Sequence, residues 1–235
     1  MSRHGNGTPD VCYNIVLPMG SAADFSIGCW ARCDNTGSAE QICFGYGKTA
    51  ATAAGAFLET LGGTWQALSG GIGRDNSTVA VVPFQWVHLV ATFTAAGAST
   101  LYVNGVNKAS SAGKANSPSA GGISALAGVS ATTPTFSLYF PGSVAKCGIW
   151  SMVLAGSDVT NLSGGSNPLT VQSGNLVFYC PLCGITVPES DPVKHNDLTV
   201  TGATRSDNPP LAFSDCEVYL EEVGMSFTGS PGRWW

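Results

Sequence analysis

Residues 83–110, PFQWVHLVATFTAAGASTLYVNGVNKAS, decide the fold of this chain. Apolar residues recur at every second position, with Leu89 and Phe93 on one face and His88 on the other. This period of two is the signature of a β-sheet with two distinct faces. The pair Asn104-Gly105 lies between two such runs and supplies the two positive φ angles of a type I′ hairpin turn. The stretch therefore predicts antiparallel strands with Val87, Leu89, Phe93, Leu101 and Val103 in the core.

The remainder of the chain follows the same short-strand pattern. Glycine-rich turns separate the segments, and one short helix is expected at Ser157-Asp158, ending at Gly164. The expected strands cover residues 11–17, 25–32, 41–46, 56–59, 65–68, 123–129 and 136–139. Many short strands with regular turns predict an all-β, two-sheet antiparallel sandwich.

Composition and charge exclude several classes of protein. Hydrophobic residues make up 44% of the 235 and charged residues 11%, which argues against a disordered chain. Ten Lys and Arg residues are scattered and the net charge is −5, so we expect no nucleic-acid partner. No apolar run is long enough to span a membrane, and the first ten residues lack the apolar core of a signal peptide.

Several stretches resemble one family. WVHLVATFT followed by TLYVNGV, then DFSIGCWAR, FPGSVAKCGIW, LVFYCPLCG and HNDLTVTGA, are similar to the laminin-G-like, concanavalin A-like lectin/glucanase family. The resemblance implies a jelly-roll domain over residues 1–204 and a C-terminal extension over residues 205–235. Cys180 and Cys183 depart from the family pattern, which often has Trp and Asp there. The family includes lectins, glucanases and adhesion modules, so the resemblance predicts fold better than function.

The glutamates do not form a catalytic pair in the sequence. Glucanases with this fold place two acids on one strand, so that both face one cleft. Here only Glu217 and Glu221 have suitable spacing, and both fall in the expected extension. His88 alternates with Trp86 on a strand face and is expected to pack there. We therefore expect no enzymatic activity.

The eight cysteines admit more than one interpretation. Without an export signal, the default expectation is buried free thiols, which behave as small hydrophobic side chains. A metal site formed by Cys29, Cys33, Cys180 and Cys183 is the weaker alternative, because Cys29 lies inside an expected strand. Disulfides remain open, since spacing alone cannot assign them.

Two kinds of binding site follow from the resemblance. Family members often hold calcium in loops, and the pairs Asp34-Asn35 and Asp75-Asn76 carry suitable oxygen ligands. The alternative is that Asp and Asn simply favour turns. For a sugar, the candidate aromatic is Trp65, near the glycine-rich turns, with Asp75 and Asn76 as polar candidates; a core or edge position for this tryptophan is the alternative. No cofactor is expected apart from optional calcium.

Two functional classes remain, a virion accessory protein and a carbohydrate-binding module. The stretches quoted above also resemble the laminin-G-like jelly rolls found in bacteriophage structural proteins, and this resemblance implies the first class: a decoration or fibre protein of a bacteriophage, on the virion surface and assembled in the host cytoplasm. Its partners would be a capsid or tail protein, copies of itself, or host surface glycans. Arg233, Trp234 and Trp235 are the expected contact residues, because Trp and Arg dominate interface energies. The alternative is a lectin-like, calcium-dependent module.

Overall fold

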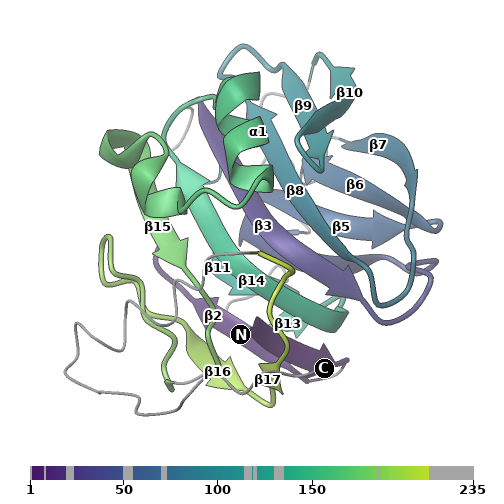
Figure 1. The fold of residues 1–235 in the computed structure, drawn as a ribbon, viewed down its shortest axis with the longest axis vertical. Helices are drawn as coiled ribbons and strands as arrows, with labels where there is room; N and C mark the ends of the chain where they lie inside the picture. Colours follow the sequence, from purple (N-terminus) through teal and green to yellow (C-terminus); the bar gives the residue numbers. More distant parts are fainter. Residues whose placement is uncertain are drawn as a thin grey trace, which may run out of the picture.

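The protein is a sandwich of two antiparallel sheets, as predicted (Figure 1). The computed structural model describes residues 2–7, 9–19, 24–49, 55–69, 73–113, 118, 121–129, 135–184 and 186–211. Its elements are β1 (Ser2–Asn6), β2 (Val11–Asn14), β3 (Phe25–Cys33), β4 (Gln41–Gly47), β5 (Gly55–Leu61), β6 (Thr64–Ser69), β7 (Gly73–Ala80), β8 (Trp86–Phe93), β9 (Ser99–Val103), β10 (Val106–Ser111), β11 (Gly122–Ala125), β12 (Gly128–Val129), β13 (Phe136–Ser137), β14 (Pro141–Trp150), α1 (Gly156–Ser163), the 3₁₀ turns η1 (Pro168–Thr170) and η2 (Ser173–Asn175), β15 (Leu176–Cys180), β16 (Thr199–Thr201) and β17 (Thr204–Ser206).

The strand order explains why the chain forms one sandwich. Sheet A has the order β10-β9-β8-β3-β14-β1-β17, and β15 also pairs with β14. Sheet B has the order β16-β2-β11-β4-β5-β6-β7. Both sheets combine strands from the beginning, middle and end of the described chain, so neither can form from one continuous segment.

The hairpin that the sequence predicted forms as expected. β8 pairs with β9 in the register Leu89↔Val103, and β9 pairs with β10. Asn104 and Gly105 have φ angles of 50° and 79°, which fits the type I′ turn. The Asn104 side chain also accepts a hydrogen bond from the backbone N–H of His88 at 2.9 Å. The turn residue therefore ties the hairpin to the start of β8 as well as reversing the chain.

The core lies between the sheets. The five residues predicted to be there, Val87, Leu89, Phe93, Leu101 and Val103, are all buried. Facing them from sheet B are aromatic side chains such as Phe44, Tyr46 and Trp65. Full burial of one large apolar side chain stabilises a fold by roughly 1.5–3 kcal/mol, so this cluster accounts for much of the driving force.

A second apolar layer covers part of the outer face of sheet A. α1 lies across this face, and Val159 and Leu162 pack there with Trp150 of β14. The helix ends at Gly164 as predicted, and Asp158 caps its start by accepting from the backbone N–H of Ala155 at 3.3 Å. Sheet A is thus covered on both faces over this region.

A buried ion pair joins β1 to the segment between β15 and β16. The Arg3 Nε donates to Glu189 Oε1 at 2.6 Å, and the two side chains are 6% and 2% exposed. Strand β17 pairs with β1 in the register Arg3↔Arg205, so the sheet extends to Ser206, past the boundary expected at residue 204. The domain boundary remains a prediction, and residues 212–235 lie outside the described part.

Strands β1, β7 and β17 were not predicted from the sequence. β1 reads SRHGN and β7 reads GRDNSTVA, and neither has an apolar alternation. Both obtain their strand conformation from neighbours, β1 from β14 and β7 from β6. In the described residues, no helix has the length and apolar character needed to cross a bilayer.

Candidate functional site

A row of side chains crosses the outer face of sheet A at the end away from α1. Strand register places Trp86 of β8 opposite Arg32 of β3, Arg32 opposite Ser143 of β14, and Ser143 opposite His4 of β1. Paired residues of antiparallel strands present their side chains on the same face. We call Trp86, Arg32, Ser143 and His4 the cross-strand row.

Hydrogen bonds connect the members of this row. Arg32 Nη2 donates to the hydroxyl oxygens of Ser143 and Ser206 at 3.2 and 3.3 Å. His4 Nδ1 lies 3.2 Å from the same Ser143 hydroxyl, and its Nε2 lies 3.2 Å from the Asn6 side-chain oxygen. These contacts fix the orientation of the arginine and the histidine along the surface.

Asp34, directly after β3, completes the polar part of the site. Its Oδ1 lies 3.8 Å from Arg32 Nε, too far for a hydrogen bond, and its Oδ2 lies 3.6 Å from His4 Nε2. Arg32 Nε and Asp34 Oδ1 are buried and neither has a hydrogen-bond partner. At the separation between Arg32 Nε and Asp34 Oδ1, a hydroxyl group can bridge the donor and the acceptor. The two groups therefore form an ion pair in which neither of these atoms makes a hydrogen bond.

Trp86, the aromatic member of the row, and Phe84, two residues before it on the chain, are together called the aromatic rim. The Arg32 guanidinium carbon lies 5.6 Å from the ring centroid of Trp86, a cation–π contact. Phe84 is 67% exposed and has a φ angle of +63°, which is unfavourable for a bulky residue. Its backbone N–H donates to the Cys33 carbonyl at 2.8 Å, which ties this loop to the end of β3. The fold therefore holds a large apolar ring in solvent beside polar groups, in a strained conformation.

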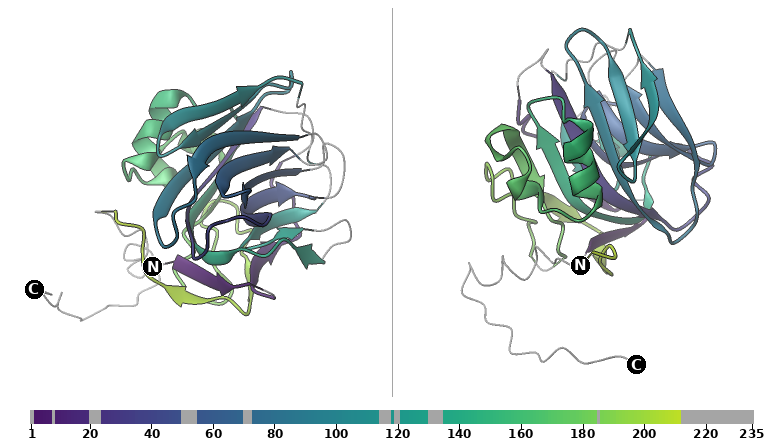
Figure 2. Two further views of the ribbon diagram at one scale, coloured as in Figure 1. Left: turned by 90° about the vertical axis from the view of Figure 1, so that its right-hand side faces the viewer. Right: turned by 45° about the horizontal axis from the view of Figure 1, so that its top comes forward.

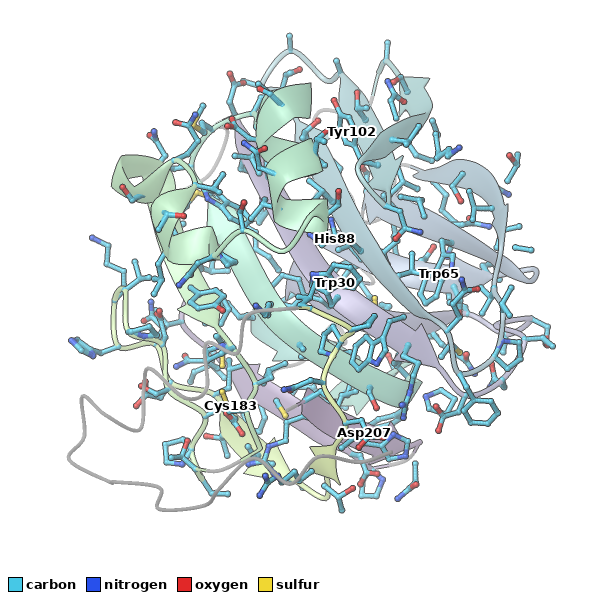
Figure 3. All side chains as sticks on the ribbon, in the orientation of Figure 1. Trp30, Trp65, His88, Tyr102, Cys183 and Asp207 are labelled. Atoms are coloured by element: carbon cyan, nitrogen blue, oxygen red, sulfur yellow. The ribbon has the colours of Figure 1, made fainter. Side chains whose placement is uncertain are left out.

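His88 and Trp30 form the adjacent rung of the same face. The two residues pair in register, their rings are 5.2 Å apart, and they are only 4% and 8% exposed. Burial and the nearby positive charge of Lys146 lower the pKa of His88 to about 3. The imidazole is therefore neutral at physiological pH and packs on the tryptophan, as the alternation in β8 predicted (Figure 3).

The sugar-binding role considered for Trp65 conflicts with its position. The side chain is 0% exposed and packs in the core, 6.3 Å from the ring of Phe140. The ring is therefore not available to a ligand at the surface, and the core alternative describes its position correctly. The sequence reading failed because glycine-rich turns flank β6 on both sides, although the tryptophan itself points between the sheets.

Asp75 and Asn76 lie in β7 and not in a loop. Asp75 is buried and accepts hydrogen bonds from the hydroxyls of Ser99 and Ser111 at 2.5 and 2.6 Å. It therefore connects the edge of sheet B to β9 and β10 of sheet A. Asn76 is exposed, and its side-chain oxygen accepts from the backbone N–H of Thr78 at 2.8 Å.

The calcium ligands considered from the sequence lie in separate environments. Asp34 contacts Arg32 and His4, whereas Asp75 contacts serines at another edge. Asn35 uses its side-chain oxygen to accept from the Gly37 backbone N–H at 2.7 Å, which is the turn-forming alternative. No group of three His, Cys, Asp or Glu side chains in the described ranges is arranged to hold a metal ion. Arg233, Trp234 and Trp235 lie outside those ranges, and so do Glu217 and Glu221.

Two other glutamates meet on the outer face of sheet B. Arg74 of β7 contacts Glu59 of β5 at 2.6 Å and Glu40 at 2.5 Å. Glu59 is fully buried, and this burial raises its pKa to about 7 although Arg74 opposes the rise. The two carboxylates share one arginine and do not flank an open cleft, so they are not arranged as the acid pair of a glycosidase.

Most of the cysteines behave as predicted. Cys12, Cys29, Cys33, Cys43, Cys147 and Cys180 are free and buried. Burial raises their pKa values, for example that of Cys12 to about 12. These thiols are therefore poor nucleophiles and poor metal ligands. Cys183 is an exception, because it is disulfide-bonded, so the alternative that paired it with Cys29, Cys33 and Cys180 at a metal is wrong.

The sequence did not identify the cross-strand row or the aromatic rim. Phe84, Trp86 and His88 alternate after Pro83, and this alternation was the one available signal. Arg32, Ser143 and His4 are more than 25 residues apart, and only strand pairing brings them together. Their adjacency follows from register, which a single sequence does not reveal.

Comparison with known proteins supports the fold. A family model described as the concanavalin A-like lectin/glucanases superfamily matches residues 7–160, more than half of the chain. The strands β15, β16 and β17, which complete both sheets, lie beyond this match. No curated protein sequence matches the chain.

Two solved structures share the architecture. One, from Bacteroides ovatus, is described as a candidate carbohydrate-binding protein; it is 16% identical, has a TM-score of 0.66, and the match covers 90% of this chain and 62% of that one. The other is a heptameric SAP-like pentraxin from Limulus polyphemus, 14% identical with a TM-score of 0.52, covering 69% of this chain and 80% of that one. The chain thus spans less than two thirds of the Bacteroides protein. At these identities the likeness concerns the fold alone.

Proposed function

The chain belongs to the concanavalin A-like lectin/glucanases superfamily, and from that premise we propose that it is a non-catalytic carbohydrate-binding domain. The binding site is the cross-strand row with its aromatic rim, on the outer face of sheet A. The observation that carries the proposal is the exposed ring of Phe84 and the half-buried ring of Trp86 next to the partly exposed side chains of Arg32 and Asp34.

Sugar hydroxyls match the polar half of this site. A hydroxyl group is both a donor and an acceptor. The Arg32 and Asp34 side chains are 16% and 25% exposed, so a sugar hydroxyl would accept from the accessible part of the guanidinium and donate to the accessible part of the carboxylate. A ligand anion would satisfy Arg32 but would be repelled by Asp34. The site is therefore better suited to a neutral glycan than to an acidic one.

The aromatic rim provides the apolar half. Ligand sites combine apolar and aromatic surface with a few oriented polar groups. Phe84 is already exposed, and Trp86 is half-buried and oriented by Arg32. A preformed platform loses little conformational freedom on binding.

Binding of neutral oligosaccharides by calorimetry and NMR tests the proposal. Phe84→Ala and Asp34→Ala should each weaken binding about tenfold or more, which corresponds to about 1.4 kcal/mol. Val106→Ala is the matched control, because Val106 is also exposed but lies on β10. Equal affinities for the wild type and both site variants would overturn the assignment of the site.

We further propose that this domain acts as an accessory protein on the surface of a bacteriophage particle. The supporting observations are the resemblance of its sequence motifs to such proteins and the Arg233-Trp234-Trp235 terminus, whose residue types favour protein interfaces. Its partners would be a capsid or tail protein or further copies, with host glycans bound at the row. If the protein does not sediment with particles assembled in the host cytoplasm, the virion location is contradicted. The glycan proposal is not affected by that result.

A further inference from the structure

A short segment after β17 lies over the outer face of sheet A. Residues 207–211, which we call the strap, leave the sheet edge and run to the side where α1 lies, as Figure 1 and the left view of Figure 2 show. At its start, the Ser2 hydroxyl donates to the Asp207 carbonyl at 2.6 Å. At its end, Leu211 lies next to Gly165, just beyond α1. The strap thus spans the face from one edge to the helix.

The surface beneath the strap continues the candidate site. Trp30 and His88 lie two residues along β3 and β8 from Arg32 and Trp86, on the same face. They are nearly fully buried, yet they are not part of the apolar cluster beneath α1. In the view of Figure 3, the end of the strap overlaps the part of sheet A in which Trp30 is labelled. Pro209 is the buried residue of the strap. We infer that the strap supplies the cover over this rung.

Beneath the strap, one polar atom of His88 makes no hydrogen bond. Its Nδ1 is buried and has no hydrogen-bond partner. A polar ring atom without a partner is unfavourable in a closed structure, and water or a ligand hydroxyl would satisfy it after opening. The closed arrangement therefore carries a cost that opening removes.

The residues of the strap allow it to move away from the sheet. Pro209 and Pro210 have no backbone N–H, so neither can add a ladder hydrogen bond to the sheet. The Leu211 N–H donates within the strap, to the Pro209 carbonyl at 2.7 Å. The strap can therefore be lifted without breaking strand pairing.

We propose that the strap covers a second glycan subsite formed by Trp30 and His88, and that its displacement extends the cross-strand row by one rung. One rung adds two residues along the strands, or about 7 Å. The subsite rests on the proposed glycan function of the row. It would take a further neutral sugar unit, with Trp30 as the stacking ring and His88 Nδ1 as a hydrogen-bonding atom.

The first test opens the strap and does not depend on any glycan. The full-length variant Pro209→Gly/Leu211→Ala removes the buried proline and the contact with Gly165. NMR titration should show the pKa of His88 moving from about 3 in the wild type toward the ordinary value near 6.5. Pro210→Gly, at an exposed position, is the control and should leave it unchanged. An unchanged His88 titration in the opened variant would overturn the strap as the cover.

The second test closes the strap reversibly. A Cβ on Gly165 would lie 3.9 Å from the Leu211 Cβ, within the range of a disulfide. The variant Gly165→Cys/Leu211→Cys should bind a long neutral oligosaccharide about tenfold more weakly when oxidised than when reduced. The opened variant should bind it more tightly than the wild type, and Trp30→Ala should abolish that gain. The wild type under both redox conditions controls for the native disulfide at Cys183, and Gly165→Cys alone controls for strain at its φ of +98°.

The two tests separate the strap from the proposed function. If His88 becomes titratable but no variant binds any glycan, the proposed function fails and the subsite fails with it. If glycans bind equally to the locked, wild-type and opened forms, the row binds sugar but the subsite is refuted.

Discussion

Removal of Arg3 should destabilise the domain strongly, because Arg3 ties β1 to the part of the chain that follows β15. Its Nε donates to Glu189 at 2.6 Å, and its two terminal nitrogens donate to the carbonyls of Ala203 and Thr186 at 3.2 and 2.7 Å. Glu189 also accepts from the Gly184 backbone N–H at 2.8 Å. The ion pair therefore joins β1 to segments that follow β15.

The expected loss in the free energy of unfolding follows from the burial of this ion pair. The two side chains are 6% and 2% exposed, so Arg3→Met leaves a carboxylate buried without its countercharge. Breaking such a pair costs about 3–5 kcal/mol, a large share of the 5–15 kcal/mol that a domain has. The double variant Arg3→Met/Glu189→Leu removes both charges and should cost no more than either single variant, although the backbone groups of Thr186, Ala203 and Gly184 lose partners.

The loss should also depend on pH. Burial already raises the pKa of Glu189 although Arg3 opposes the rise. Without Arg3 the carboxyl should take up a proton more readily. The destabilisation by Arg3→Met should therefore be largest near neutral pH and shrink as the pH falls and Glu189 becomes neutral.

Urea denaturation of the four proteins of this double-mutant cycle, followed by tryptophan fluorescence, measures these values. Arg205→Met is the matched control, since Arg205 is the register partner of Arg3 but is exposed. A loss below about 1 kcal/mol for Arg3→Met, or a double variant whose loss equals the sum of the singles, would refute the reasoning.

Three further predictions follow from the core and from sheet B. Leu89→Ala should lower the free energy of unfolding by about 2–5 kcal/mol in urea titrations, because the side chain is fully buried, and a change near zero would contradict this packing. Glu59→Gln should become more stable relative to the wild type as the pH rises from about 4.5 to 7. The reason is that the pKa of Glu59 in the folded state is raised to about 7, so the fold disfavours its charged form. Melting curves with the opposite trend would mean that the pair with Arg74 stabilises the charged form. The purified protein should release no reducing ends from β-glucans, because Glu40 and Glu59 are both engaged with Arg74; release that is lost on mutating either glutamate would disprove this.

The fold was predictable because its signals are local. Alternation in residues 83–110 identified β8, β9 and the inward face, and Asn104-Gly105 identified the turn between β9 and β10. The start of α1 near Ser157-Asp158 and its end at Gly164 followed from residues that favour helix ends. Each of these signals depends on a few consecutive residues whose backbone preferences and side-chain polarity agree with the final structure.

Strands without such signals were missed. β1 and β7 are polar and contain glycine, and β7 carries the Asp75-Asn76 pair that favours turns elsewhere. Their strand conformation comes from hydrogen bonds to β14 and β6, and Asp75 is buried because Ser99 and Ser111 satisfy its oxygens. Tertiary pairing overrode local preference at both positions.

By itself the sequence determined the sandwich, its core face and its family, because burial alternates with a period that the residues themselves record. Only the tertiary structure decided the candidate site. Trp65, chosen from its neighbours in sequence, points into the core, whereas Arg32, Ser143 and His4 meet through the register of β3, β14 and β1. The packing of the whole chain determines which strands pair. The set of residues that share a surface therefore depends on contacts between distant parts of the sequence, which no short stretch contains.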